Sequence, residues 1–256
     1  MPIIVIPESN SHWYRRDGSS IHTTIGKNGL PRPTNLKDAR EHGYLPSVTS
    51  ILKVKSKPQL EAWKQEQAIM AALTLPRSHD EPEDMFAKRV VQDMDRQGKE
   101  AAEFGTRIHN YIERTHLNIP HQGEFDLLEY CRSYSTWFGE NITEVIHAEK
   151  VLVNDRENYA GTVDLVAIHK EWGRIVLDVK TQKVKDKPNF YFEWALQLAA
   201  YGNCIEEPVK LVSCIIDSGK PAEPVFKVWE DYDGALKAFQ CCHYLWRYER
   251  NMLTDS

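Results

Sequence analysis

Three side chains that could act together occur in two segments with the composition of β-strands. Asp178 and Lys180 lie in the segment 174–181, where Val, Ile and Leu otherwise predominate. Because strand side chains alternate between faces, this aspartate and this lysine should leave the same face. Asp164 is the single carboxylate of the preceding apolar segment, 160–169. Taken alone, each could be an ordinary salt-bridged or hydrogen-bonded group on a half-exposed strand.

Considered together, the two segments favour a chemical role. If the strands are adjacent and antiparallel, Asp164 and Asp178 can meet at one end. Two carboxylates at close range repel and raise one another's pKa. A hard cation such as Mg²⁺, which prefers a few carboxylates and retained water, relieves this repulsion. Lys180 could then position or deprotonate an attacking water, so these residue types indicate metal-assisted phosphodiester hydrolysis.

A third element follows in the segment 190–204, which has helical spacing. Gln197 and Tyr201 are four residues apart and therefore share one helix face. The glutamine amide could orient Lys180 or a phosphate. An exposed polar pair without a role is the alternative interpretation.

The elements that must position these groups are indicated by hydrophobic periodicity. Strands are predicted at 3–6, 12–15, 21–25, 143–153, 160–169, 174–181, 209–216 and 224–229. A polar loop is expected over 26–43. Helices are predicted after Ser47, from Pro58, around 86–94, from Thr106 behind Gly98 and Gly105, over 127–138, over 190–204 and from about 231 onward. The order predicts an α/β (α+β) fold, in which helices flank a mixed central sheet and an N-terminal helical elaboration is attached.

The length, apolar stretches and cysteine content of the chain exclude some classes of protein. The 256 residues suit one large domain, and no stretch of 18 apolar residues could span a membrane. The segment 1–6 lacks the basic flank and cleavage site of a secretory signal, so a cytoplasmic location is expected. Five irregularly spaced cysteines without a C-x-x-C pair argue against a zinc site.

The net charge of −5 argues against bulk electrostatic binding of duplex DNA. Any contact with nucleic acid must then come from a local basic patch. Lysines at 180, 183, 185 and 187 could form a phosphate-binding rim. They could equally be the solvated side chains of a loop.

Five short motifs, in this order along 46–205, together resemble the PD-(D/E)XK nuclease superfamily, and more narrowly its RecB-type and mitochondrial genome maintenance exonuclease branch. They are Pro46-Ser47-Val48-Thr49-Ser50-Ile51-Leu52, Gly105-Thr106-x-x-His109, Gly161-Thr162-Val163-Asp164, Asp178-Val179-Lys180-Thr181 and Gln197-x-x-x-Tyr201. Each motif alone is weak, and the ordered set is specific.

The resemblance implies a role for each position. Metal ligands would be His109, Asp164, Asp178 and the carbonyl of Val179. Lys180 would orient the water, and Gln197 would support the site. Substrate contacts would come from Tyr201, Thr181, Lys183 and Lys185. Glu149 stands where the family often has an acidic residue, and it is equally well explained as a solvated strand charge.

The resemblance also implies a restriction-endonuclease-like core and a cofactor, Mg²⁺ or Mn²⁺. Some relatives hold an iron–sulfur cluster with one early and three clustered late cysteines, and the cysteines of this sequence do not follow that pattern, so no cluster is expected. Residues 1–46 would form N-terminal strands and a loop, and 47–256 the nuclease domain. Within it, an arch-like helical region over about 58–100 would precede a catalytic core over about 101–256. The expected partner is DNA, single-stranded or with free ends, and no membrane. A structure-selective endonuclease and a non-catalytic nucleic-acid-binding subunit are the alternatives.

Overall fold

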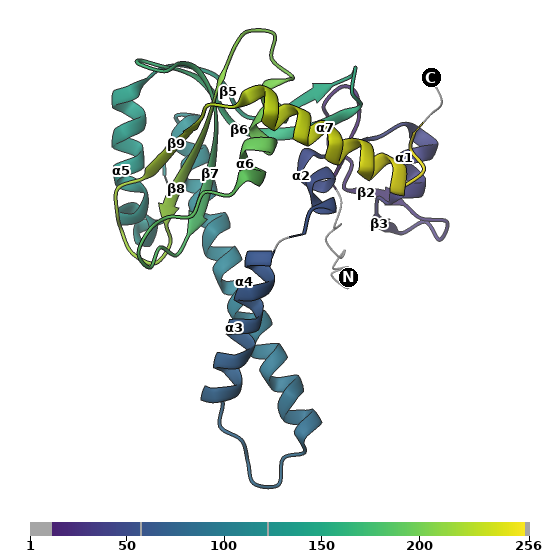
Figure 1. The fold of residues 1–256 in the computed structure, drawn as a ribbon, viewed down its shortest axis with the longest axis vertical. Coiled ribbons are helices and arrows are strands. Elements are labelled where there is room, and N and C mark those ends of the chain that lie inside the picture. The colour runs from purple at the N-terminus through teal and green to yellow at the C-terminus, as the bar shows by residue number, and fades with distance from the viewer. Residues whose placement is uncertain (1–11, 57, 122, 254–256) are drawn as a thin grey trace.

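The computed structural model describes residues 12–56, 58–121 and 123–253, which form a mixed α/β fold around a five-stranded sheet (Figure 1). The strands are β5 (Ile142–Asn154), β6 (Tyr159–His169), β7 (Gly173–Gln182), β8 (Lys210–Asp217) and β9 (Val225–Trp229), and they lie side by side in sequence order. All neighbours are antiparallel except β7 and β8, which are parallel. A parallel pair needs a crossover, and α6 (Phe192–Gly202) provides it.

Helices cover both faces of the sheet. On one face, α6 and α7 (Tyr232–Glu249) bury a core that includes Val163, Val176 and Leu198. On the other face, α5 (Phe125–Asn141) and the C-terminal part of α4 (Glu83–His116) bury a second core. Strands covered on both sides need apolar residues on both faces, so the buried polar groups of these strands stand out. The strands and helices predicted from residue 127 onward are confirmed.

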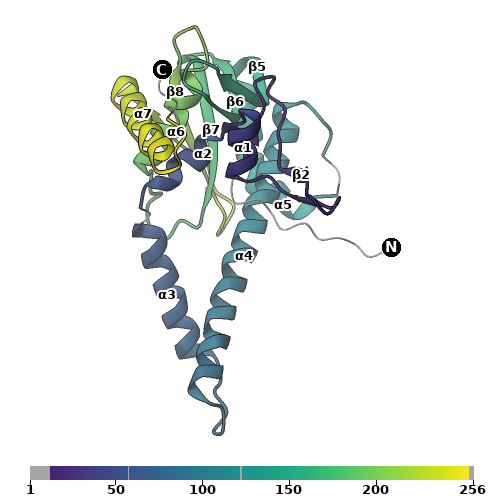
Figure 2. The ribbon, with the colours of Figure 1, turned by 90° about the vertical axis from the view of Figure 1, so that its right-hand side faces the viewer.

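Helix α3 (Pro58–Thr74) and the first part of α4 form a hairpin that projects away from the sheet (Figure 1). The two helices meet at its tip and diverge towards the body (Figure 2). Separate helices around Gly98 and Gly105 were predicted, and this is wrong, because α4 is continuous over 34 residues. Gly105 is tolerated because a side chain there would lie 2.7 Å from Thr181 Oγ1, so the glycine lets α4 approach β7.

The N-terminal region packs against β6 through short elements. They are β1 (Trp13–Tyr14), β2 (Thr23–Ile25), β3 (Pro31–Pro33), α1 (Leu36–His42), β4 (Leu45–Pro46), α2 (Val48–Ile51) and a 3-10 turn, η1 (Leu52–Val54). The predicted N-cap of α2 is confirmed, because Ser47 Oγ accepts a hydrogen bond from the Ser50 amide. The loop predicted over 26–43 is wrong in part: Asn35 and Asp38 form a capping box that starts α1. The strand predicted at 3–6 lies outside the described residues.

Within the described part of the chain, none of the helices has the length and apolar character needed to cross a membrane.

Candidate active site

The site lies where β6 and β7 separate. Their ladder runs from His169 and Gly173 to Leu165 and Leu177, and no pairing continues beyond that last rung in the described residues. Asp164 and Asp178 are therefore the first residues past the ladder on the two strands. Asp164 Oδ2 instead accepts a hydrogen bond of 2.7 Å from the Val179 amide. The divergence gives both carboxylates room that a continuous ladder would deny them.

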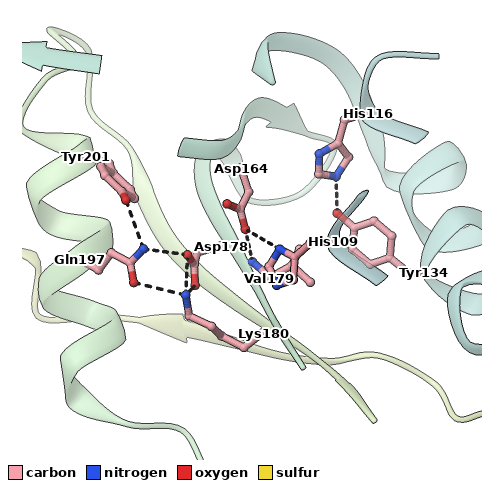
Figure 3. A network of polar contacts seen from close by, with 9 residues as sticks. All are labelled: His109, His116, Tyr134, Asp164, Asp178, Val179, Lys180, Gln197 and Tyr201. Carbon is pink, nitrogen blue, oxygen red and sulfur yellow. Dashed lines mark hydrogen bonds and ion pairs between the residues drawn. The ribbon is translucent and has the colours of Figure 1, made fainter. Parts of the chain in front are cut away.

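Asp178 is the centre of a polar network that four side chains build (Figure 3). Lys180 Nζ donates to Asp178 Oδ1 at 2.8 Å and lies 2.7 Å from Oδ2. Gln197 Nε2 donates to the same Oδ1 at 3.1 Å and to the hydroxyl of Tyr201 at 3.2 Å. Lys180 also donates to Gln197 Oε1 at 3.3 Å. The pairing of Asp178 with Lys180 follows from strand alternation, and the helical spacing of Gln197 and Tyr201 joins them to it.

Gly161 is the reason that Tyr201 can reach this network. A Cβ at position 161 would lie only 2.8 Å from Cε1 of the Tyr201 ring. Glycine on β6 therefore admits the ring, which packs against the strand backbone. The glycine of the sequence motif thus has a steric role that places α6 beside β6 and β7.

His109 approaches the other side of Asp164 from α4. Its Nδ1 lies 4.0 Å from Asp164 Oδ2, within the range of an ion pair but beyond a hydrogen bond (Figure 3). Burial lowers the pKa of His109, although the charge of Asp178 opposes the shift. The imidazole is therefore neutral at pH 7, and a neutral imidazole is the form that binds metals.

Burial shifts the pKa values of the charged groups of the site. It raises the pKa of Asp164 well above the ordinary value, and the nearby charge of Asp178 raises it further. Burial alone would lower the pKa of Lys180, but the charges of Asp178 and Asp164 outweigh it, and the pKa is raised. Lys180 is therefore an ammonium at neutral pH. It offsets part of the negative charge that the two aspartates bring together.

Glu149 is a third carboxylate, whose charge acts on Asp164 and Asp178. Its neighbours Ala148 and Lys150 pair with Leu165 and Val163, so Glu149 on β5 lies across from Asp164 on β6. Burial, followed by the charges of Glu113 and Asp178, raises the pKa of Glu149 to about 7. Its φ of 48° is unusual for a residue with a side chain. Of the two sequence interpretations, a solvated strand charge does not fit this half-buried position.

Glu113 was not predicted as a site residue. It follows His109 by four residues on α4, so both lie on the same face of that helix. That spacing was visible in the sequence, but the nearness of Glu113 to Glu149 on β5 was not.

The residues expected to contact a substrate lie on the strand end and loop that follow Lys180. Thr181 packs against Gly105 of α4. Lys183 and Lys185 are exposed, and Lys185 Nζ lies 3.6 Å from Glu66 Oε1 on α3. The lysines are therefore at the rim between the site and the helical hairpin. Val179 has its side chain in the core, and its amide binds Asp164.

Two neighbouring carboxylates are a set of ligands that a divalent cation prefers. Among the residues that the structure describes, no three His, Cys, Asp or Glu side chains lie close enough together to form a metal site as they stand. One feature nevertheless suits a cation: Asp178 Oδ2 is buried and receives no aligned hydrogen bond, although Lys180 lies nearby. A buried carboxylate oxygen that pairs with an ammonium in this way can bind a metal cation instead. Asp164 and His109, on the other side, are of the right chemical type.

Comparison with known proteins gives no independent assignment. No family model matches the chain, and no curated protein matches its sequence.

Proposed function

We propose that the protein is a divalent-metal-dependent nuclease of the PD-(D/E)XK class, with a restriction-endonuclease-like core, that hydrolyses phosphodiester bonds of DNA. The observation that carries the proposal is the ion pair of Asp178 and Lys180, placed beside Asp164 where β6 and β7 diverge. A structural salt bridge alone would not need a second, half-buried carboxylate next to it. The raised pKa of Asp164 supports a functional site, because such shifts cluster where chemistry occurs.

Asp164, Asp178 and His109, helped by the carbonyl of Val179, would hold Mg²⁺ or Mn²⁺. When bound, the cation would supply positive charge that polarises a phosphodiester and lowers the pKa of water. The protein's own groups do the rest. Lys180, held by Gln197, orients the attacking water and stabilises charge that develops on the phosphate. Tyr201 fixes the amide of Gln197 through its hydroxyl, so the ammonium of Lys180 keeps its direction.

We further propose that the enzyme is an exonuclease with a preference for single-stranded DNA. The helices α3 and α4 diverge towards the body of the protein (Figure 2), and the pair of Lys185 with Glu66 links the loop after β7 to α3. Together these segments would surround a strand that reaches Lys180. A passage of this kind accepts a free end of a flexible strand and excludes an unbroken duplex.

The test is cleavage of end-labelled single- and double-stranded DNA in Mg²⁺, in Mn²⁺ and in EDTA. We expect mononucleotides or short products from single strands with either cation and none in EDTA. Asp178→Asn should abolish cleavage while the protein remains folded and still binds DNA, because the carboxylate serves the cation. Near-wild-type cleavage by this variant, or cleavage in EDTA, would refute the proposal.

A further inference from the structure

A lysine enclosed by aromatic rings lies on β9, outside the network around Asp178. Lys227 Nζ is 3.9 Å from the ring centroid of Trp229 and 5.8 Å from those of Phe190 and Phe192. Among the described residues, no ion pair joins Lys227 to a carboxylate. The ammonium therefore has aromatic rings as neighbours in place of an acidic partner, and cation–π contacts leave its N–H groups able to bind an anion.

The lysine is in the same row of the sheet as the candidate catalytic aspartate. Asp178 of β7 pairs with Ser213 of β8, and Ser213 pairs with Lys227 of β9. Directly paired residues share a face, so all three side chains leave the side covered by α6. Two strand spacings separate Asp178 from Lys227, which is roughly 10 Å between their Cα atoms. This is a short step along a flexible single strand of nucleic acid.

Helix α6 connects the two places. Gln197 reaches Asp178 from one flank of the helix. Phe192, five residues earlier at the first residue of α6, reaches the other flank and lies 5.9 Å from the ring of Trp229. Helix α6 thus carries one residue of the network around Asp178 and one residue of the aromatic cluster around Lys227.

Phe192 is the unusual member of the cluster. Its exposed fraction is 77%, whereas Trp229 is 8% exposed and donates its indole N–H to Ser213 Oγ at 3.0 Å. Packing accounts for the burial of Trp229. The aliphatic stem of Lys227 covers that ring, which accounts for part of the position of the lysine. Packing does not explain an aromatic ring that remains in water beside an unpaired ammonium. An exposed ring and a cation together match the two parts of a nucleotide, its base and its phosphate.

We propose that Phe192 and Lys227 bind a nucleotide flanking the scissile phosphodiester, with its base stacked on Phe192 and its phosphate against the ammonium of Lys227. The inference rests on the proposed nuclease function and adds a subsite to it. Stacking on an aromatic face tolerates any base, so the subsite is independent of sequence. It requires an unpaired base, because a base within a duplex is already stacked on its neighbours.

The experiment measures binding of a fluorescent single-stranded oligothymidylate in EDTA, together with steady-state cleavage in Mn²⁺. Phe192→Ala should weaken binding by roughly 5- to 150-fold, the range for loss of one base stack. Lys227→Met keeps the stem on the rings and removes the charge. It should lower the slope of log affinity against log salt by about 0.7, the value for one single-strand phosphate. Both losses should appear in KM rather than in kcat.

Matched substitutions separate these effects from general damage. Phe125→Ala removes a phenylalanine with an 83% exposed side chain at the start of α5, and Lys170→Met removes an exposed lysine in the β6–β7 turn. Neither should change affinity or salt dependence. Phe192→Trp and Lys227→Arg, which preserve the ring and the charge, should retain binding. If Lys227→Met does not fold, Lys227→Gln, which also removes the charge, takes its place in the salt titration.

An abasic site in the oligonucleotide supplies the sharpest comparison. Scanned along the strand, it should weaken binding to the wild type at one position and have no effect there on Phe192→Ala. If the wild type cleaves DNA but Phe192→Ala and Lys227→Met keep its KM and salt slope, the subsite is refuted and the nuclease proposal stands. If the wild type neither binds nor cleaves single strands, both proposals are overturned.

Discussion

Replacement of Lys180 by methionine tests the candidate site through stability as well as activity. Methionine keeps most of the stem and removes the ammonium that lies 2.8 and 2.7 Å from the oxygens of Asp178. Asp178 is only 2% exposed, so water cannot replace the lost partner. Gln197 Nε2, at 3.1 Å, would be the donor that remains from the network.

The magnitude follows from this burial. Breaking a buried ion pair by removal of one partner costs about 3–5 kcal/mol. Lys180 is itself 24% exposed and Gln197 still donates, so we expect the lower end, about 3 kcal/mol. For a chain of this size each 1 kcal/mol lowers Tm by roughly 2–4 °C, which gives a fall of about 6–12 °C.

Divalent cations should partly reverse this loss. In the wild type the ammonium and a cation compete for Asp178, whereas in Lys180→Met the cation meets no competitor. Because a ligand that binds the folded state stabilises it, Mn²⁺ should raise Tm more in the variant than in the wild type. Cleavage should nevertheless be lost, because the orienting ammonium is gone.

Thermal unfolding in EDTA and in Mn²⁺ measures both effects. Lys183→Met, in the exposed loop after β7, is the matched control and should unfold like the wild type. Adding Asp178→Asn to Lys180→Met removes the stranded buried charge and should recover part of the lost stability. Equal Tm values for Lys180→Met and the wild type in EDTA would refute the reasoning, as would an equal response to Mn²⁺.

Three further predictions concern the metal, pH and access to the site. His109→Ala should weaken Mn²⁺ binding by at least roughly tenfold and make cleavage require more Mn²⁺; unchanged affinity by calorimetry would count against a ligand role. Burial, with the charge of Arg247, lowers the pKa of His243 to about 4, so its contribution to stability is present above about pH 6.5 and is lost as pH falls towards 4. Urea unfolding should therefore show the difference between His243→Phe and the wild type changing by about 3 kcal/mol across that window, and parallel profiles would contradict it. Covalently closed single-stranded circles should resist degradation relative to linear strands of the same sequence; comparable rates would rule out obligatory threading and favour an endonuclease.

Local patterns in the sequence were sufficient to predict the strands of the sheet and the residues that make up the candidate site. Alternation along β7 places Asp178 and Lys180 on one face whatever the rest of the chain does, and helical spacing does the same for Gln197 and Tyr201. The strands β5 to β9 and their flanking helices were confirmed because their apolar patterns are long and regular. Where signals were short, the prediction was poorer. The capping box of α1 was missed, and Gly98 and Gly105 were taken for a helix boundary.

Contacts between distant segments were decided by the tertiary structure alone. Gly105 remains inside α4 because β7 lies against it, a contact that helix propensity does not contain. The raised pKa of Glu149 depends on β5 pairing with β6 and on α4 packing against β5. Lys227 joins the row of Asp178 only because β8 lies between their strands. The sequence thus determined which chemical groups are available and which face of its strand or helix each one occupies. The packing of the sheet and helices determined which of these groups meet, because burial and cross-strand distance are properties of the folded chain.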